Sequence, residues 1–184
     1  MKNILVKSSG DLTDGQEFYN FVADKALQNR VVVICGGGTK ISAALEAAGY
    51  DVEFDKLERR VTATVAEKII MRDVLAGEAK NLQKKFLHWN VIVVPPILYL
   101  GSISCPINGD DMVKAHELGF DEIYVLTKKD RKKKKKKIFK DFPKVQIIGM
   151  GDSEVNLNVL LEIFFKKLRK AATTFWIGVK RFMP

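Results

Sequence analysis

The sequence has few residues of the kinds that bind metals or crosslink a chain. It contains two cysteines, Cys35 and Cys105, and two histidines, His88 and His116, each isolated from the others. Neither pair has the close spacing of a zinc site, and two cysteines do not make the disulfide framework of a small secreted domain. We therefore expect buried or half-buried thiols and no metal site built from protein ligands.

Long apolar runs are also missing. No stretch approaches the roughly 20 apolar residues that a membrane-spanning helix needs. The chain starts with a short apolar segment that Lys7 ends, whereas a signal peptide needs a longer one. We expect a soluble, cytoplasmic protein with no membrane contact. The length of 184 residues fits one domain, residues 1 to 184, with a substantial core.

The net charge is concentrated in one segment. It amounts to +9 at pH 7, and the run RKKKKKK at residues 131 to 137 supplies seven positive charges. The rest of the chain has 24 basic and 22 acidic residues, so it is nearly neutral. We predict a basic, solvated loop at 131 to 137. Two further hypotheses are a lid over nucleotide phosphates and a contact to RNA or another polyanion. Nucleic acid is the weaker partner, because the run contains no aromatic residue for base stacking.

Apolar segments alternate with amphipathic ones along the chain. This alternation predicts an α/β fold, a three-layer α/β/α sandwich with a mostly parallel central sheet. The expected strands are residues 3 to 7, 31 to 34, one within 90 to 98 that Pro95 and Pro96 stop, 122 to 126 and 144 to 150, with a possible edge strand at 174 to 179. The expected helices are residues 15 to 29 (with Asp14 as N-cap), 40 to 49, a long or broken one within 57 to 86, 110 to 119 and 153 to 170.

One stripe of apolar residues marks the long helical region. It consists of Val61, Val65, Ile69, Ile70, Val74 and Leu75. Because these residues recur near the helical period, we expect them to pack in the core.

Four loops that follow or adjoin the expected strands carry small, polar or charged residues. They read VKSSGDL (6 to 12), CGGGTK (35 to 40), INGDDM (107 to 112) and LTKKD (126 to 130). Ligands of open α/β sheets bind outside the carboxyl ends of the strands, so we expect these loops to converge on one site. Lys7 is a compact cation suited to a phosphoryl group in transfer. The alternative is that Lys7 simply leaves the sheet for solvent.

Three successive glycines follow the second expected strand. Gly36, Gly37 and Gly38 permit positive φ and an anion-binding nest of amides at the start of a helix. Their spacing matches neither the dinucleotide pattern G-x-G-x-x-G nor the Walker pattern G-x-x-x-x-G-K-[ST]. The plain alternative, a tight strand-to-helix turn, does not usually need three glycines.

The four motifs, in this order within residues 3 to 130, resemble the amino acid kinase superfamily, which includes acetylglutamate, carbamate, aspartate and uridylate kinases. VKSSGDL is most similar to the uridylate kinase form K-x-S-G-E. CGGGTK resembles the G-G-G turn of the family, with Cys35 where some members have histidine. INGDDM and LTKKD resemble the family's N/T-x-D loop and its T-K-V-D-G or T-D-V-D-G segment.

The resemblance implies ATP-dependent phosphoryl transfer to a small metabolite, and it favours a phosphate-bearing acceptor such as a nucleoside monophosphate. It implies that Lys7 contacts the transferred group and that Asp110 or Asp111 orients the catalytic lysines. Phosphate and substrate would bind at Ser9, Gly10, Gly36, Gly37, Gly38 and Asn108, and nucleotide at Thr127, Lys128, Lys129 and Asp130. Mg²⁺ would be carried on the nucleotide. Members commonly form homodimers, for which residues 57 to 86 are the expected interface.

The sequence also departs from the family pattern. Arg131 replaces the glycine of T-K-V-D-G, and the lysine run replaces the loop that follows it. No G-G-M-x-x-K segment supplies a second catalytic lysine, for which Lys128 and Lys129 are the candidates. The alternative function is therefore a non-catalytic relative that binds nucleotide, an oxyanion or a partner.

Overall fold

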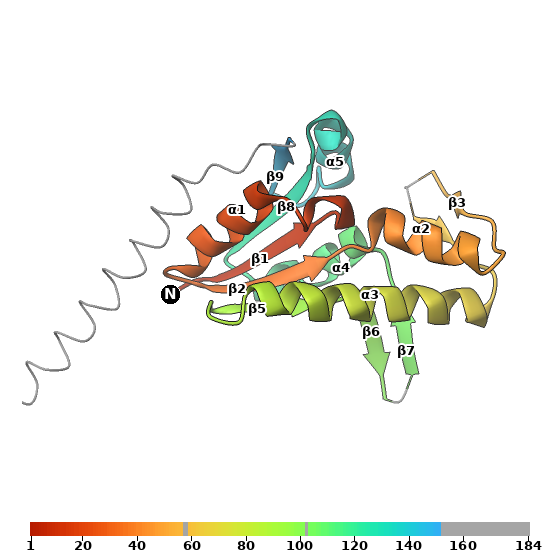
Figure 1. Cartoon of the computed structure of the whole chain (residues 1–184). Helices are drawn as coiled ribbons and strands as arrows, with labels where there is room; N and C mark the ends of the chain where they lie inside the picture. Colours follow the sequence, from red (N-terminus) through yellow and green to blue (C-terminus); the bar gives the residue numbers. More distant parts are fainter. Residues whose placement is uncertain (57–58, 102, 152–184) are drawn as a thin grey trace, which may run out of the picture.

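The protein is built around a five-stranded parallel sheet, seen in a computed structural model that describes residues 1–56, 59–101 and 103–151 (Figure 1). All four pairings between neighbouring strands are parallel. The expected α/β class with a mostly parallel central sheet is therefore confirmed. The strands lie in the order β5 (Val91–Val94), β2 (Arg30–Cys35), β1 (Asn3–Ser8), β8 (Glu122–Lys128) and β9 (Val145–Met150).

Strand β1 lies at the centre of the sheet and is buried on both faces. Every residue of β1 after Asn3 is buried. Ile4 and Val6 belong to the hydrophobic cluster on one face, and Leu5 belongs to the cluster on the other. This alternation explains why β1 reads as a continuous apolar run rather than as a half-polar strand.

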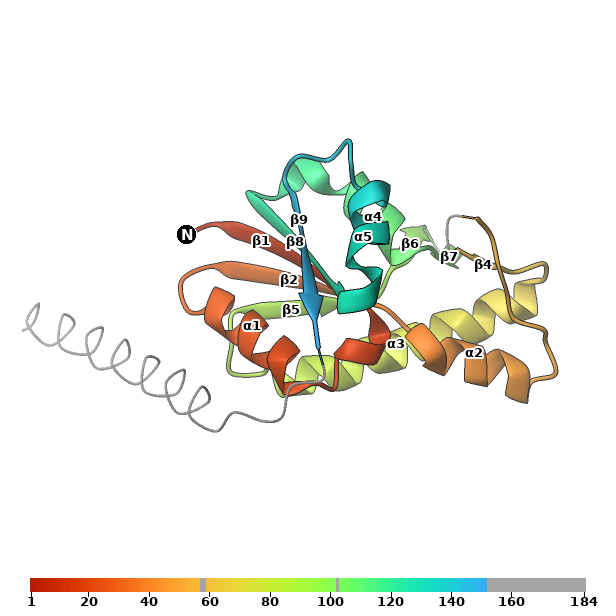
Figure 2. The same ribbon diagram turned by 90° about the horizontal axis from the view of Figure 1, so that it is seen from above.

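Helices cover both faces of the sheet (Figure 2). Helices α1 (Gln16–Ala26) and α3 (Val65–Lys85) pack on one face, and α4 (Gly109–Ala115) and α5 (Lys132–Ile138) pack on the other. Helix α2 (Gly38–Ala47) starts beyond the carboxyl end of β2 and packs along α3. The arrangement is compatible with the expected three-layer sandwich.

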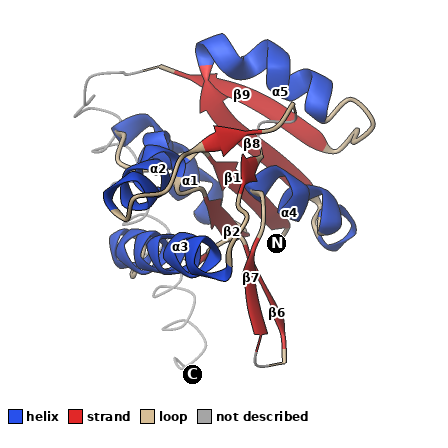
Figure 3. Ribbon diagram, turned by 90° about the vertical axis from the view of Figure 1, so that its right-hand side faces the viewer, coloured by secondary structure: helices blue, strands red, loops and turns tan. Residues whose placement is uncertain are grey.

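Two hairpins and three short 3₁₀ turns complete the described fold. Hairpin β3 (Glu53–Phe54) and β4 (Arg60–Val61) lies near α2, and hairpin β6 (Ile97–Leu100) and β7 (Ile103–Pro106) projects from the body (Figure 3). Pro95 and Pro96 end β5, as predicted. The sequence did not predict that the chain continues into β6. The 3₁₀ turns are η1 (Gly10–Leu12), η2 (Glu117–Gly119) and η3 (Lys129–Arg131).

Helix α3 corrects the predicted apolar stripe. The helix begins after Thr64, whose side chain accepts from the Glu67 amide in a capping box. Its buried apolar side chains are Met71, Leu75, Ala79 and Leu82. Val65 is 74% exposed and Ile69 is 43% exposed, and Val61 lies before the helix in β4. The stripe was wrong at its start because the cap, and not the apolar residues before it, sets the phase of the helix. The dimer interface expected in this region stays a prediction.

The remaining predictions concern the N-cap of α1, the two cysteines, membrane crossing and the C-terminal elements. Gly15 is the N-cap of α1, so the prediction of Asp14 was wrong; the Asp14 carboxylate pairs with Lys85 at 2.8 Å instead. Cys35 is buried and Cys105 is half-buried, as expected. Within the described ranges, none of the helices has the length and apolar character that a membrane crossing requires. The predicted helix 153 to 170 and strand 174 to 179 lie outside the described residues.

Candidate functional site

The carboxyl ends of β1 and β2 open into a cavity of about 1070 Å³. Strand β1 is the switch point of the sheet, because β2 and β5 lie on one side of it and β8 and β9 on the other. Ligands of open α/β sheets bind at such a point. The wall of the cavity includes every residue predicted to be catalytic or to bind phosphate and substrate: Lys7, Ser9, Gly10, Gly36, Gly37, Gly38, Asn108, Asp110 and Asp111.

The loop after β1 packs directly against the glycine turn. The Gly36 amide donates to the Ser8 carbonyl at 3.0 Å. A Cβ on Gly10 would lie 2.5 Å from the Gly36 carbonyl oxygen and 2.7 Å from the Gly38 nitrogen. These are contacts with backbone atoms, which cannot rotate away. Glycine is therefore required at position 10 for the two loops to meet.

Asp11 lies against the first turn of α2. Its Oδ1 accepts from the backbone amide and from the hydroxyl of Thr39, each at 3.1 Å. Gly38 has a φ of +45°, and a Cβ there would lie 2.4 Å from Asp11 Oδ1. A carboxylate of the protein thus uses part of the anion-binding capacity of this turn. Within the described residues, the amides of Gly37 and Gly38 have no hydrogen-bond acceptor.

Three buried charged side chains from three different elements meet at the bottom of the cavity. Lys7 comes from β1, Asp110 from the first turn of α4 and Lys135 from α5. The Lys7 ammonium lies 3.0 Å from Asp110 Oδ1, at ion-pair distance but outside hydrogen-bond geometry. Lys135 donates to Asp110 Oδ2 at 2.6 Å. The three side chains are only 7–9% exposed, so water screens this arrangement weakly.

The start of α4 holds Asp110 in place. The side chain of Asn108, the N-cap residue, accepts from the Asp110 amide at 2.8 Å. Asp111 faces another way: its side chain is 42% exposed and pairs with Lys114 at 3.4 Å. Of the two aspartates that the sequence left open, Asp110 alone lies between two lysines.

Burial and charge pull on the pKa of Asp110 in opposite directions. Burial alone would raise it, but the neighbouring ammonium groups of Lys7 and Lys135 outweigh burial and lower the pKa to about 2. Burial lowers the pKa of Lys7, and the charge of Lys135 lowers it further, while Asp110 acts in the opposite direction. Asp110 is therefore an anion at neutral pH, as the pairing requires.

The depressed pKa of Asp110 predicts acid-sensitive stability. The pKa is about 2 when folded and about 3.9 in an unfolded chain, so the unfolded state binds the proton more readily. The stabilisation is present above about pH 4 and is lost as the pH falls towards 2. Urea unfolding at stepped pH checks this. In Lys135→Gln one of the two cations that lower the folded-state pKa of Asp110 is gone, so the folded and unfolded pKa values should lie closer together and the acid-induced loss of stability should be smaller. An unchanged profile in that variant would contradict the assignment.

The lysine run is a helix and not the loop that the sequence predicted. Residues Lys132–Ile138 form α5. Phe139, just after the helix, and Ile138 pack in the core, and Lys135 is 5% exposed at the cavity. The ion pair with Asp110 and this apolar anchor hold the segment to the body. Lys135 is thus the second lysine beside Asp110, whereas the role of Lys128 or Lys129 as a second catalytic lysine stays a prediction.

The predicted nucleotide segment, residues 127 to 130, does not line the cavity. Thr127 is fully buried at the end of β8, and its hydroxyl has no partner among the described residues. Lys128, Lys129 and Asp130 are exposed. None of the four lines the cavity, so their role in nucleotide binding stays a prediction.

The cavity is also lined by a basic residue that the sequence did not single out, Arg60. Arg60 donates to the Gly38 carbonyl at 3.2 Å and to the Ser42 hydroxyl at 2.8 Å, and burial lowers its pKa. Its guanidinium lies 5.0 Å from the centre of the Phe54 ring. No sequence pattern distinguished Arg60 from other surface arginines. In total, seven basic and four acidic side chains line the cavity, which favours an anionic ligand.

Comparisons with known proteins identify no family for this chain. No protein-family model matches the chain, and no curated protein matches its sequence. Among the described residues, no group of three or more histidine, cysteine or carboxylate side chains is placed to hold a metal ion. What the site offers is a buried cation pair held by one carboxylate, beside two backbone amides that can donate hydrogen bonds to an anion.

Proposed function

We propose that the protein is a small-molecule kinase with an amino acid kinase-like fold. It transfers a phosphoryl group from ATP to a small acceptor, and a phosphate-bearing acceptor such as a nucleoside monophosphate is favoured. The observation that carries the proposal is the position of Asp110 between Lys7 and Lys135. Phosphoryl transfer depends on positioning and charge neutralisation more than on covalent chemistry, and this arrangement supplies both.

The side chains have distinct roles in this mechanism. Lys7 and Lys135 direct two ammonium groups at the equatorial oxygens of the phosphoryl group, where negative charge spreads during transfer. Asp110 holds both ammonium groups in place, and its charge opposes the lowering of the Lys7 pKa by burial. The free amides of Gly37 and Gly38 donate to the same group or to the acceptor. Because the three charged side chains are already ordered, little reorganisation accompanies the reaction.

The residues fit a nucleotide phosphate with its magnesium ion. When bound, ATP supplies the phosphoryl group and Mg²⁺ neutralises charge on the phosphates. Mg²⁺ in such sites usually has few protein ligands and is held mainly by phosphate oxygens. Asp11, Asp55 and Asp111 are the cavity carboxylates besides Asp110. Asp55 pairs with Arg59 at 2.7 Å and Asp111 with Lys114 at 3.4 Å. These three carboxylates are the acidic oxygen ligands that the cavity can offer.

A non-catalytic relative is the second candidate. The observation that favours it is that the segment Thr127 to Asp130, expected to bind nucleotide, does not line the cavity. In that case the basic cavity binds a nucleotide, an oxyanion or an anionic group of a partner without transferring phosphate.

A comparison within one helix tests the proposal. Purified protein with Mg²⁺ and ATP is incubated with a panel of nucleoside monophosphates and small carboxylic acids, and products are identified by mass spectrometry. Lys135→Gln should lower the turnover of the identified acceptor by on the order of 10²–10³, because a charge at the transferred group is lost. Lys136→Gln is the matched control, since Lys136 is exposed on the same helix, and its turnover should stay at the parent value.

Two outcomes oppose the kinase proposal. Equal turnover in Lys135→Gln and Lys136→Gln would remove Lys135 from catalysis. If ATP raises the melting temperature of the protein but no acceptor in the panel is phosphorylated, the non-catalytic candidate is favoured.

A further inference from the structure

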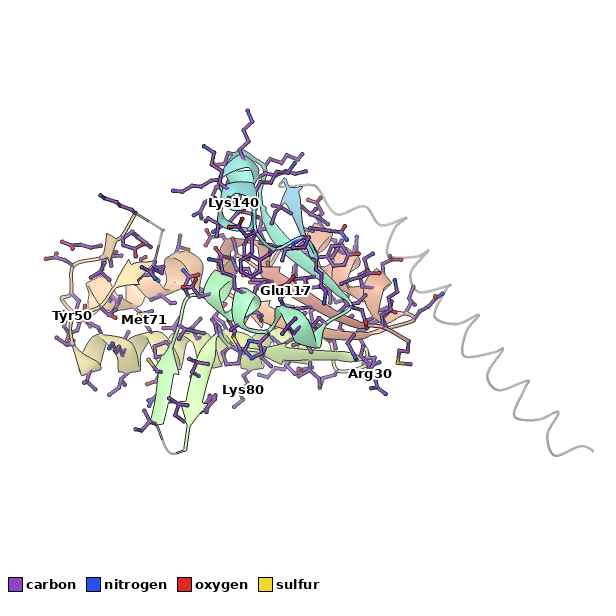
Figure 4. All side chains as sticks on the ribbon, turned by 180° about the vertical axis from the view of Figure 1, so that it is seen from behind. Arg30, Tyr50, Met71, Lys80, Glu117 and Lys140 are labelled. Atoms are coloured by element: carbon purple, nitrogen blue, oxygen red, sulfur yellow. The ribbon has the colours of Figure 1, made fainter. Side chains whose placement is uncertain are left out.

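Helix α5 presents basic residues on two sides. Arg131, Lys134 and Lys135 line the cavity. Lys132, Lys133, Lys136 and Lys137, here called the outer lysines, are all exposed. In Figure 4 side chains extend outward from the region of α5, near the labelled Lys140. The basic surface therefore starts inside the cavity and continues around the helix.

The helix spaces these charges as close neighbours. Residues three or four apart on a helix have Cβ atoms about 5–6 Å apart. Lys134 is three residues from Lys137, which is four residues from Lys133. A row of cations thus leads from the cavity wall to the outer face without a gap.

Among the described residues, no acidic side chain neutralises the charges of the outer lysines. In the part of the chain that the structure describes, no carboxylate pairs with any of the four. Like charges four residues apart destabilise a helix, so α5 is held by Lys135 and its apolar anchor against its own repulsion. An extended anion lying along α5 would relieve this repulsion, and every phosphate added to it would meet another lysine.

The residue types in this row of cations favour one class of polyanion over others. Residues 131 to 137 include no aromatic side chain, so they offer phosphate contacts and no stacking surface for bases. Lysine binds phosphate as a point charge. The row also ends at the proposed phosphoryl-transfer centre. These features fit a chain made of phosphates alone, with one end in the cavity.

We propose that linear inorganic polyphosphate binds along α5 with its terminal phosphoryl group in the cavity, beside the ammonium groups of Lys7 and Lys135, and serves as a phosphoryl donor besides ATP. The donor role rests on the proposed kinase function, whereas the binding mode does not.

In the transfer, an acceptor oxygen forms a bond to the terminal phosphorus and the bond from that phosphorus to the bridging oxygen breaks. The bridging oxygen keeps the electron pair, and the departing chain is one phosphate shorter. A hydroxyl acceptor releases its proton to solvent, and a phosphate dianion has none to release.

The dependence of affinity on chain length tests the binding mode. Dissociation constants of tripolyphosphate and of long-chain polyphosphate are measured by calorimetry at constant salt. The parent protein should bind the long chain tighter by on the order of tenfold, because additional lysines are engaged. The variant with all four outer lysines changed to serine should keep the parent affinity for tripolyphosphate, but it should no longer bind the long chain more tightly than tripolyphosphate. Changing the same four residues to arginine should restore the tighter binding of the long chain. If the serine variant still binds the long chain more tightly by the parent factor, the proposal is overturned.

Three further measurements separate the possible failures. Lys135→Gln should weaken both ligands, and unchanged binding of the long chain would mean that it lies on the surface only, which overturns the proposal. Equal competition by single-stranded oligodeoxythymidylate of matched phosphate number would overturn it in favour of nucleic acid. Turnover with ATP but none with polyphosphate removes the donor role and leaves the kinase proposal intact. Turnover with neither donor, despite a chain-length gain, removes the kinase proposal and the donor role while the binding mode stands.

Discussion

Asp110→Asn is expected to lower the free energy of unfolding by about 3–5 kcal/mol, because removal of one partner leaves buried charge uncompensated. The asparagine would face the ammonium groups of Lys7 and Lys135, which are 7–9% exposed. Proteins of this size are commonly stable by only 5–15 kcal/mol, so the loss is a large fraction of the total. Urea unfolding followed by circular dichroism measures it.

Asp111→Asn is the matched control for this substitution. Asp111 is the next residue on the same helix, but its side chain is 42% exposed and its pair with Lys114 spans 3.4 Å. Exposed pairs contribute about 0–1 kcal/mol, so the variant should unfold close to the parent. Should Asp110→Asn not fold, Asp110→Glu retains the charge and tests the same contact. Similar losses in the two asparagine variants would show that α4, and not the buried pairing, sets the effect.

Gly10→Ala is expected to destabilise the protein by about 1–3 kcal/mol or more, the range of an overpacked core. The added methyl would lie 2.5–2.7 Å from backbone atoms of Gly36, Gly37 and Gly38. The β1 loop and the glycine turn must separate to admit it. Because both loops line the cavity, we also expect weaker binding of phosphate ligands. Thermal unfolding and calorimetry with tripolyphosphate measure the two effects.

Gly77→Ala should have the opposite sign. Gly77 is exposed within α3, and a Cβ there meets nothing within 4 Å. Alanine in an exposed helix interior stabilises by about 0.5–1 kcal/mol relative to glycine. If Gly10→Ala were as well tolerated as Gly77→Ala, the close approach of the two loops would be refuted.

The parts of the site that the sequence predicted are those specified by local pattern. Lys7 follows an unbroken apolar run, and the three glycines follow another. Both patterns can be recognised in the sequence without knowledge of tertiary contacts. The parallel sheet then brings their carboxyl ends together. Asn108 and Asp110 were named from the resemblance of INGDDM to a family motif, with Asp111 as the alternative to Asp110, and the structure places Asn108 as the N-cap of α4 and Asp110 in its first turn.

Lys135 was not predictable from the sequence. A run of six lysines has no periodicity, so nothing in it distinguishes the inward residue from its neighbours. What selects Lys135 is the position of Asp110 on another helix together with the burial of Phe139 just after α5. Arg60 was not predicted for a similar reason. Its place in the cavity wall depends on contacts with Gly38 and Ser42, which are distant from it in the sequence.

The central position of β1 bears on how the chain is synthesised. β1 pairs with β2 on one side and with the much later β8 on the other. Until β8 has left the ribosome, β1 presents an open edge of unpaired amides and carbonyls, which other strands can add to. Lys7 also has no carboxylate partner until α4 follows. The nascent chain therefore passes through an aggregation-prone stage, and rapid completion of residues 109 to 128 would protect it.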